Sequence, residues 1–380
     1  MHTGLVRVRI ELVFEQIELV CKQAGDLELL FHVPQFTPLA RPLIIMKPFL
    51  PQSMKTRFFN QPGVMVSEIG LGCWQMGGAD WGNVDEKLAF EVFTAAVNSG
   101  ITFFDTADVY GDGRSEEFIG KFLRATGHDL FVATKLGRTC DLFPDKYTEQ
   151  GLRSATERSL KRLQMEALDL TQLHCVPTEV LRSGEVFDWL RKLQKEGKIK
   201  SFGASVESME EGLLCLEQEG LASLQIIFNI FRQKPIEALF EVAKLKKVAV
   251  IVRLPLASGL LSGKMTKNTQ FPEKDHRNYN RDGQAFNVGE TFAGLPFEKG
   301  IELVETIKPL LPDGMSMAQM AQRWILDYDA VTTVITGASR PEQVLANAST
   351  SGLAPLDPGL HKRLRSFYKT DVSAQIRGPY

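Results

Sequence analysis

From Ser67 onward, short apolar runs alternate with longer stretches in which apolar residues recur every three or four positions. The apolar runs predict strands at 67–73, 102–107, 130–135, 168–174, 201–205, 223–228, 247–253 and 332–336. The longer stretches predict helices at 86–99, 114–125, 149–163, 184–196, 207–218, 235–245, 316–328 and 341–349. Strands rich in Val, Ile, Leu and Phe are typical of a parallel sheet that is covered on both faces. Eight such units favour an α/β fold of the closed (β/α)8 type, a TIM barrel, over an open doubly wound sheet.

Further segments complete the expected barrel. Residues 55–66, with Pro62-Gly63 between two apolar pieces, predict a hairpin that closes the barrel floor. Residues 257–297, after the seventh strand, form a long loop rich in Gly, Asn and charge, and loops of that length are usually functional or disordered. We also expect an extra helix near 298–310 and a C-terminal helix near 358–368. No GxGxxG follows the first predicted strand, which removes the main sign of a Rossmann domain.

Residues 1–53 differ in character from the rest of the chain. They contain acids such as Glu11 and Asp26, which argues against a transit peptide, and they lack the apolar core of a secretory signal. Prolines interrupt their second half. We therefore expect an N-terminal extension with little fixed structure over 1–53 and a barrel with a C-terminal tail over 54–380. A targeting or docking role for the extension stays open.

Composition excludes some partners. The 380 residues carry a formal net charge of −2 without a strongly basic segment, so neither nucleic acid nor an anionic membrane is an expected partner. No uninterrupted apolar run approaches the ~20 residues that a membrane helix needs. The five cysteines lack metal-finger and CxxC spacing and are typical of reduced thiols, so we expect a cytoplasmic protein. The sequence does not indicate an oligomeric state.

Four residues able to transfer or direct protons lie at or just after the ends of successive predicted strands: Asp105, Tyr110, Lys135 and His174. The carboxyl ends of barrel strands share one face, so we expect these side chains to meet there. The Lys135 ammonium would lower the pKa of the Tyr110 phenol, and Asp105 would hold the ammonium in place. His174 would hydrogen-bond a substrate oxygen. Such a set suits protonation of a carbonyl oxygen while hydride reaches the carbonyl carbon.

Each of these residues also has an ordinary structural explanation. An aspartate at a strand end is often a helix N-cap, and a lysine there often forms a barrel salt bridge. His174 has apolar neighbours that fit a core position, and Tyr110 before Gly111 fits an aromatic residue of a turn. The remaining histidines form no ligand set with carboxylates, so the sequence predicts no metal site. The combination of all four residues in order is what favours an enzyme.

In that combination the chain resembles the aldo-keto reductase family. The resemblance is carried by Asp105-Thr106-Ala107-Asp108-x-Tyr110-Gly111, by Lys135 and by Gln172-Leu173-His174, and it covers about Lys55 to Leu353. It implies NADPH-dependent reduction of an aldehyde or ketone, a small-molecule substrate. It also implies that Tyr110 is the general acid, that Asp105 and Lys135 tune it, and that His174 orients the substrate.

The resemblance also implies where a nicotinamide cofactor would bind. Ser205 and Gln225, which end two strands, would contact the carboxamide. Arg253 stands where many relatives have an aromatic residue that stacks on nicotinamide. A guanidinium plane can stack as well, or it can bind a substrate carboxylate, and the sequence leaves both roles open.

Two further segments resemble the family's phosphate- and adenosine-binding regions. Pro255 to Lys264 resembles the pyrophosphate loop, in which the predicted contacts are Leu256, Gly259, Leu261, Gly263 and Lys264. Ile335 to Asn347 resembles the adenosine segment, in which they are Gly337, Ser339, Arg340, Gln343 and Asn347. Ser339 and Arg340 would hold a 2′-phosphate, which favours NADPH/NADP over NADH.

The substrate pocket is expected to have tryptophan walls, Trp74 and Trp81. The segment Asp275 to Arg281 would contact an anionic ligand or be solvated surface. An alternative function is an NADPH-binding regulatory subunit of the channel-associated type with little turnover. A dehydrogenase would use the same residues in reverse, and the sequence does not decide the direction.

Overall fold

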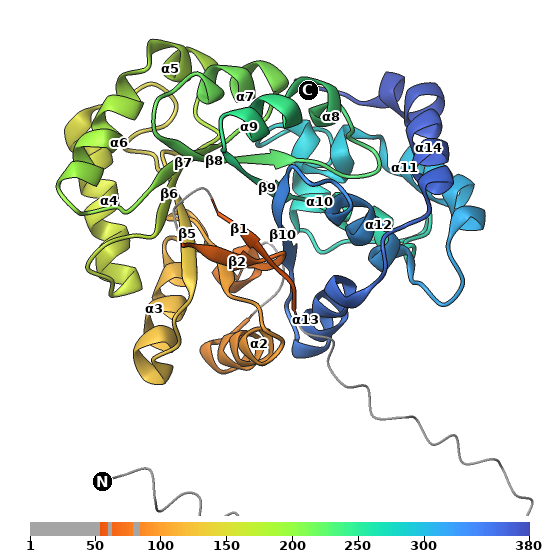
Figure 1. Cartoon of the computed structure of the whole chain (residues 1–380), viewed down its shortest axis with the longest axis horizontal. Helices are drawn as coiled ribbons and strands as arrows, with labels where there is room; N and C mark the ends of the chain where they lie inside the picture. Colours follow the sequence, from red (N-terminus) through yellow and green to blue (C-terminus); the bar gives the residue numbers. More distant parts are fainter. Residues whose placement is uncertain (1–53, 60–62, 79–83) are drawn as a thin grey trace, which may run out of the picture. The chain divides into compact units, whose positions relative to one another are not determined.

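The computed structural model describes residues 54–59, 63–78 and 84–380. Its main feature is a closed barrel of parallel strands in the order β10-β3-β4-β5-β6-β7-β8-β9 (Figure 1). The strands are β3 (Ile69–Gly72), β4 (Phe103–Asp105), β5 (Phe131–Leu136), β6 (Leu170–His174), β7 (Phe202–Ser205), β8 (Leu221–Ile227), β9 (Ala249–Arg253) and β10 (Val331–Gly337). Each predicted strand overlaps one of them, so the (β/α)8 barrel is confirmed.

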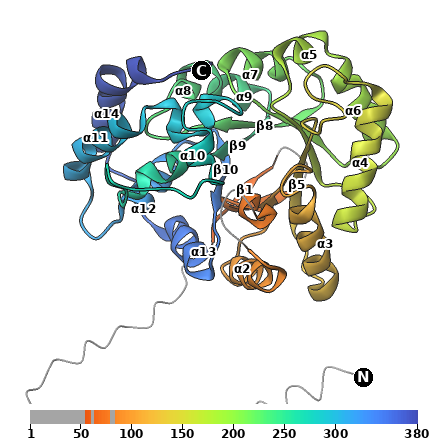
Figure 2. The ribbon, with the colours of Figure 1, turned by 180° about the vertical axis from the view of Figure 1, so that it is seen from behind.

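Helices cover the outside of the barrel in both views (Figures 1 and 2). The helices of the described part of the chain are α2 (Glu86–Asn98), α3 (Arg114–Thr126), α4 (Glu149–Leu163), α5 (Thr178–Ser183), α6 (Glu185–Lys195), α7 (Met209–Leu216), α8 (Pro235–Ala238), α9 (Phe240–Leu245), α10 (His276–Tyr279), α11 (Phe297–Ile307), α12 (Met317–Leu326), α13 (Pro341–Ala348) and α14 (Pro358–Phe367). In the described part of the chain, none of the helices has the length and apolar character needed to cross a membrane.

Two helices differ from the prediction. The helix expected over 184–196 is preceded by a short helix, α5, that was not predicted. Leu181 is the one buried side chain of α5, so the sequence of α5 shows no apolar period. The helix expected over 235–245 is divided into α8 and α9 at Leu239, whose φ of −120° departs from helical geometry. Leu239 is fully buried, and apolar periodicity alone does not reveal such a break.

The barrel floor is closed by a hairpin, as predicted. Strands β1 (Thr56–Phe58) and β2 (Met65–Ser67) pair antiparallel, and the turn residues 60–62, including Pro62, lie outside the described residues. Phe59 is fully buried and packs with its ring centroid 4.6 Å from that of Phe131. The strand expected over 67–73 is divided at Glu68, whose buried carboxylate accepts a hydrogen bond from Arg57 at 3.0 Å.

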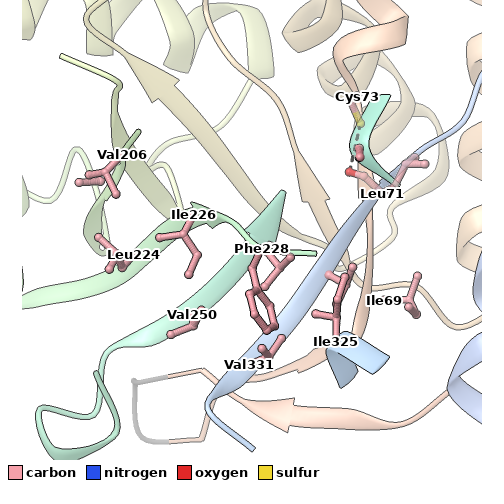
Figure 3. Packing of buried hydrophobic residues seen from close by; sticks show 14 of the residues in the cluster. Ile69, Leu71, Cys73, Val206, Leu224, Ile226, Phe228, Val250, Ile325 and Val331 are labelled. Atoms are coloured by element: carbon pink, nitrogen blue, oxygen red, sulfur yellow. Dashed lines mark hydrogen bonds between the residues drawn. The ribbon is translucent and has the colours of Figure 1, made fainter. Parts of the chain in front are cut away.

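Alternate residues of the strands face the helices and the barrel interior. Figure 3 shows Leu224, Ile226 and Val250 in the apolar cluster between the strands and the surrounding helices. Gln225 lies between two of these residues in β8 and therefore points into the barrel. Because apolar side chains occupy the outward-facing positions of the strands, the inward-facing positions can hold polar side chains.

The long segment 257–297 contains short helical turns joined by irregular chain. These are η2 (Ala257–Ser262), α10, η3 (Val288–Glu290) and η4 (Phe292–Gly294). Ser258 joins the first and last parts, because its hydroxyl donates to the Glu290 carbonyl at 3.0 Å and accepts from the Phe292 N–H at 3.1 Å. This loop, which follows β9, is therefore folded onto the end of the barrel.

The C-terminal tail holds the outer side of this loop. The Arg377 guanidinium donates to the carbonyls of Gly294 at 3.0 Å and of Leu295 at 3.3 Å. It also pairs with Asp282 at 2.6 Å. A Cβ placed on Gly378 would lie 2.6 Å from a Val288 methyl carbon, which shows how closely the tail packs on η3.

Candidate active site

The four predicted catalytic residues gather at the carboxyl ends of neighbouring strands. Asp105 ends β4, Tyr110 follows in the next turn, Lys135 lies in β5 and His174 ends β6. Asp105, Tyr110 and His174 line one cavity of about 530 Å³. The side chains that β4, β5, β6 and the turn after β4 contribute therefore come together, as the sequence predicts.

Lys135 is 1% exposed and connects the acid to the phenol. Its ammonium pairs with the Asp105 carboxylate and donates to the Thr106 carbonyl at 2.8 Å and the Tyr110 hydroxyl at 3.4 Å. Burial alone would lower the pKa of Lys135, but Asp105 and Tyr110 outweigh it and the pKa is raised. The amine therefore stays a cation beside the phenol oxygen.

Burial dominates the titration of the phenol. It raises the pKa of Tyr110 to about 12, and the positive charge of Lys135 offsets only part of that rise. The expectation that the pKa would be lowered is therefore wrong for the net shift, because the dry surroundings disfavour the phenolate more than the ammonium favours it. The phenol is protonated at neutral pH and can act as a proton donor.

His174 faces the phenol as a neutral imidazole. Its ring lies 5.9 Å from the Tyr110 ring at an angle of 86°. Burial lowers the pKa of His174 well below its usual value, and nearby cations act in the same direction. Its buried Nδ1 has no hydrogen-bond partner among the described residues. A neutral ring can donate one hydrogen bond to a substrate oxygen without competing for the proton.

Polar side chains inside the barrel surround Asp105. Gln225 donates to its carboxylate at 2.7 Å, and Gln172 approaches the same oxygen at 3.5 Å. Ser205 lies 3.5 Å from the Gln225 side-chain oxygen. Gln225 is therefore already bonded to Asp105, and its contact with a carboxamide remains a prediction.

Trp74 forms a wall of the cavity, in the predicted place. Its ring stacks on Tyr110 with 5.9 Å between centroids. Gly111, with a φ of 62°, permits this packing, because a Cβ there would lie 2.2 Å from the Gly77 carbonyl oxygen. Trp81 lies outside the described residues.

The turn that carries Tyr110 also contains a buried carboxylate, Asp108. Both of its oxygens lack a hydrogen-bond partner among the described residues, and the side chain is 3% exposed. Burial, and then the nearby Glu116 carboxylate, raise the pKa of Asp108 from its usual 3.8 to about 7, while the charges of Arg162 and Arg158 oppose the rise. Asp108 therefore binds its proton more tightly in the folded chain than in the unfolded chain.

Asp108→Asn is expected to stabilise the protein at pH 8 but not at pH 4. The raised pKa stabilises the folded state below pH 4, and that contribution is lost as the pH rises to about 7. At ~1.4 kcal/mol per pKa unit, the gain at pH 8 is at most ~4 kcal/mol. Urea unfolding at several pH values measures it. The exposed control Asp112→Asn should show no such trend, and a pH-independent effect at Asp108 would contradict the assignment.

Arg253 ends β9 and is held rigidly in the cavity wall. Its guanidinium pairs with the Glu290 carboxylate of η3 and donates to the Val206 carbonyl at 3.0 Å and the Cys175 sulfur at 3.6 Å. These contacts fix the plane of the guanidinium. They place it in the cavity, but they do not distinguish between stacking on a cofactor and binding a substrate.

The same region contains one group of potential metal ligands in the described part of the chain. Ligand atoms of Cys175, Glu207 and Glu290 lie within 4.8 Å of one another. The guanidinium of Arg253 contacts two of these three residues. The positive charge of Arg253 therefore already balances negative charge within this group.

Seven of the residues predicted to bind a cofactor line the cavity: Ser205, Gln225, Arg253, Leu256, Gly259, Gly337 and Gln343. The other six do not line it: Leu261, Gly263, Lys264, Ser339, Arg340 and Asn347. Leu261 is fully buried in the core. Asn347 accepts from Gln322 at 2.8 Å.

The cavity extends from the phenol to the start of α13. Gln343 accepts hydrogen bonds from the Ser339 N–H at 2.8 Å and hydroxyl at 3.2 Å, which orders this turn. Lys264 and Arg340 are exposed, and neither forms an ion pair with a described residue. These two cations are close in the chain to the lining residues Ser262 and Gly337, which fits the binding of an anionic ligand near these turns.

Sequence reasoning missed several lining residues. Glu290 and Phe286 come from the long loop, Gln75 follows β3, and Arg138 follows β5. No motif or period marks them. Gln75 and Arg138 lie in short loops directly after strands, whereas Glu290 and Phe286 reach the cavity through the folding of the long loop. Arg277 and Tyr279 also line it, so part of the 275–281 segment belongs to the cavity.

Comparison with known proteins gives a family match and several relatives. The chain matches the model of the Aldo/keto reductase family over residues 68–369. It is 32% identical over 297 residues to the aldo-keto reductase YhdN of Bacillus subtilis (strain 168), which covers 76% of this chain and 86% of the relative. A glycerol dehydrogenase of Gluconobacter oxydans superposes with a TM-score of 0.68 at 29% identity, covering 86% of this chain and 98% of that structure.

A more distant similarity concerns a different kind of protein. A probable voltage-gated potassium channel subunit beta of Oryza sativa subsp. japonica is 28% identical over 325 residues. The match covers 80% of this chain and 93% of that protein.

Proposed function

Because the chain belongs to the aldo/keto reductase family, we propose that it reduces an aldehyde or ketone to an alcohol with NADPH, and that Tyr110 is the general acid. The observation that carries this proposal is the contact of Tyr110 with the buried Lys135–Asp105 pair on one wall of the cavity. A protonated phenol, a fixed cation beside its oxygen and a neutral imidazole suit the protonation of a carbonyl oxygen.

The side chains have separate tasks in this proposal. His174 donates a hydrogen bond that orients the substrate oxygen toward the Tyr110 hydroxyl. Tyr110 transfers its proton to that oxygen as negative charge develops there. The Lys135 ammonium, 3.4 Å from the phenol oxygen, stabilises the phenolate that remains. Asp105 keeps the ammonium in position.

The cofactor residues follow the cavity away from Tyr110. Ser205 and Arg253 would hold the nicotinamide end, Gly259 and Lys264 the diphosphate, and Arg340 a 2′-phosphate. A bound nicotinamide cofactor supplies the hydride, which no side chain can provide. Trp74 closes the substrate side and excludes water from the reacting carbonyl.

The direct test is the loss of NADPH absorbance in the presence of a panel of aldehydes, ketones and quinones. Turnover of at least one neutral carbonyl compound is expected. NADPH binding without turnover of any of them would contradict the proposed reductase activity.

Arg340→Ala is expected to weaken NADPH binding roughly 10- to 100-fold, the size of effect expected for a charge-assisted phosphate contact. NADH lacks the 2′-phosphate, so its Kd should change less than about twofold. Cofactor fluorescence titration measures both values. Arg363→Ala, an exposed arginine on α14, is the matched control. Equal weakening of both cofactors would contradict a role in 2′-phosphate binding.

A second candidate function is a nicotinamide-binding regulatory subunit, which the similarity to the probable channel subunit favours. It predicts tight NADPH binding, negligible turnover and a stable partner protein. The absorbance assay separates the two functions, because only the reductase consumes NADPH. The similarity to a glycerol dehydrogenase also supports measuring alcohol oxidation with NADP.

A further inference from the structure

Among the residues that the structure describes, three guanidinium groups line the cavity, and they differ in their partners. Arg253 pairs with Glu290. Arg277 donates to both oxygens of Asp275, at 2.9 and 2.6 Å. Arg138 has a different environment: its Nη1 lies 3.9 Å from the nearest oxygen of Glu207, beyond hydrogen-bond distance. Arg138 is thus the lining arginine whose positive charge lacks a hydrogen-bonded carboxylate among the described residues.

Geometry explains why Glu207 is a weak partner for Arg138. Its nearest oxygen is 3.9 Å from Nη1, and the two side chains are 19% and 22% exposed. Solvent screens an ion pair of this kind, so the nearby carboxylate neutralises Arg138 only in part.

Arg138 is nevertheless held in place. It follows β5, three residues after Lys135, and its side chain is 22% exposed. Its guanidinium lies 5.1 Å from the centroid of the Phe143 ring, a cation–π contact that leaves the N–H groups at its edge available. A partly buried, oriented guanidinium with unused donors is a preorganised site for an anion.

The site belongs to the reacting end of the cavity. Arg138 and His174 line the same cavity. Trp74 and Phe286 line the same cavity and offer apolar surface to the body of a substrate. A substrate held by His174 can therefore extend toward Arg138.

We propose that Arg138 binds a carboxylate of the substrate, so that the preferred substrates are aldehydes or ketones that also carry a carboxylate. This inference rests on the proposed reductase function. A planar carboxylate accepts two parallel hydrogen bonds from one guanidinium. An arginine with one weak acidic partner balances at most one further negative charge, whereas a phosphate dianion would keep a second charge unbalanced.

The test compares 2-, 3- and 4-carboxybenzaldehyde with their uncharged methyl esters in the wild-type protein, Arg138→Gln and Arg138→Lys. We expect kcat/KM of at least one acid to exceed that of its ester by roughly 10- to 100-fold in the wild type, the effect of a charge-assisted hydrogen bond. Arg138→Gln should remove the preference, so that each acid and its ester have similar kcat/KM values. Arg138→Lys should keep part of the preference for the acid over its ester.

A surface arginine provides the matched control. Arg158→Gln removes an exposed ion pair with Asp141 and should keep the acid preference of the wild type. An acid-to-ester ratio that is unchanged in Arg138→Gln, or a wild-type preference for every ester, would overturn the inference. Turnover of neutral aldehydes alone would overturn this inference but not the reductase function.

A binding measurement does not depend on turnover or on a folded variant. Calorimetric titration of the NADP-loaded wild-type protein with benzoate and with benzamide compares a carboxylate with its neutral analogue. Benzoate is expected to bind at least about tenfold more tightly. Equal affinity would overturn the carboxylate site even if no aldehyde were reduced.

Discussion

Tyr110→Phe is expected to lower kcat for carbonyl reduction by roughly 10²–10⁴-fold, the contribution of a positioned general acid. Phenylalanine keeps the ring that stacks on Trp74 at 5.9 Å and removes only the hydroxyl. The cavity and its cofactor contacts should therefore persist, and the Kd for NADPH should change less than about threefold. Stopped-flow hydride transfer and cofactor titration on the same sample measure the two effects separately.

Tyr328→Phe provides the matched control for this variant. Tyr328 packs among Phe228 and Trp324, outside the cavity, and it also has a raised pKa of about 12, caused mainly by burial. Losing that hydroxyl should not change kcat. Retention of more than about a tenth of wild-type turnover in Tyr110→Phe would contradict the assignment of Tyr110 as the acid.

Lys135→Met is expected to abolish reduction and also to lower the free energy of unfolding by about 3–5 kcal/mol. Lys135 is 1% exposed and Asp105 is 2% exposed, so the variant leaves a carboxylate buried without its cation. Gln225 and Gln172 remain as neutral donors and cannot balance the charge. Urea denaturation and the NADPH assay measure the two losses.

The double variant Lys135→Met/Asp105→Asn distinguishes the two losses. It removes both charges and keeps the shape of the Asp105 side chain, so most of the lost stability should return. Activity should stay absent because no ammonium remains beside the phenol. Recovery of activity in the double variant would show that the pair only supports the fold.

Much of the barrel could be predicted because its strands are buried on both faces. Continuous apolar runs then mark each strand, and a residue such as Lys135 or His174 at the end of a run has a position fixed by the barrel. This reasoning fails for the helix expected over 235–245, which is divided at Leu239. Leu239 is as apolar as its neighbours, so the apolar pattern does not reveal the break.

Parts of the site depend on contacts that no local pattern records. Glu290 reaches Arg253 across 37 positions of sequence. Gln225 bonds Asp105 across 120 positions. The net pKa of Tyr110 depends on how completely the cavity excludes water, which spacing does not encode. Long-range pairing and burial, rather than motifs, thus determine this part of the chemistry.

The position of Arg377 has a practical consequence for recombinant work. Its contacts connect the last residues of the chain to Gly294 and Asp282, in the loop whose Glu290 pairs with Arg253. An affinity tag or fluorescent protein fused after Tyr380 is expected to disturb these contacts and, through them, the loop that lines the ligand cavity. Assays on C-terminal fusions are therefore expected to report on a disturbed cavity wall.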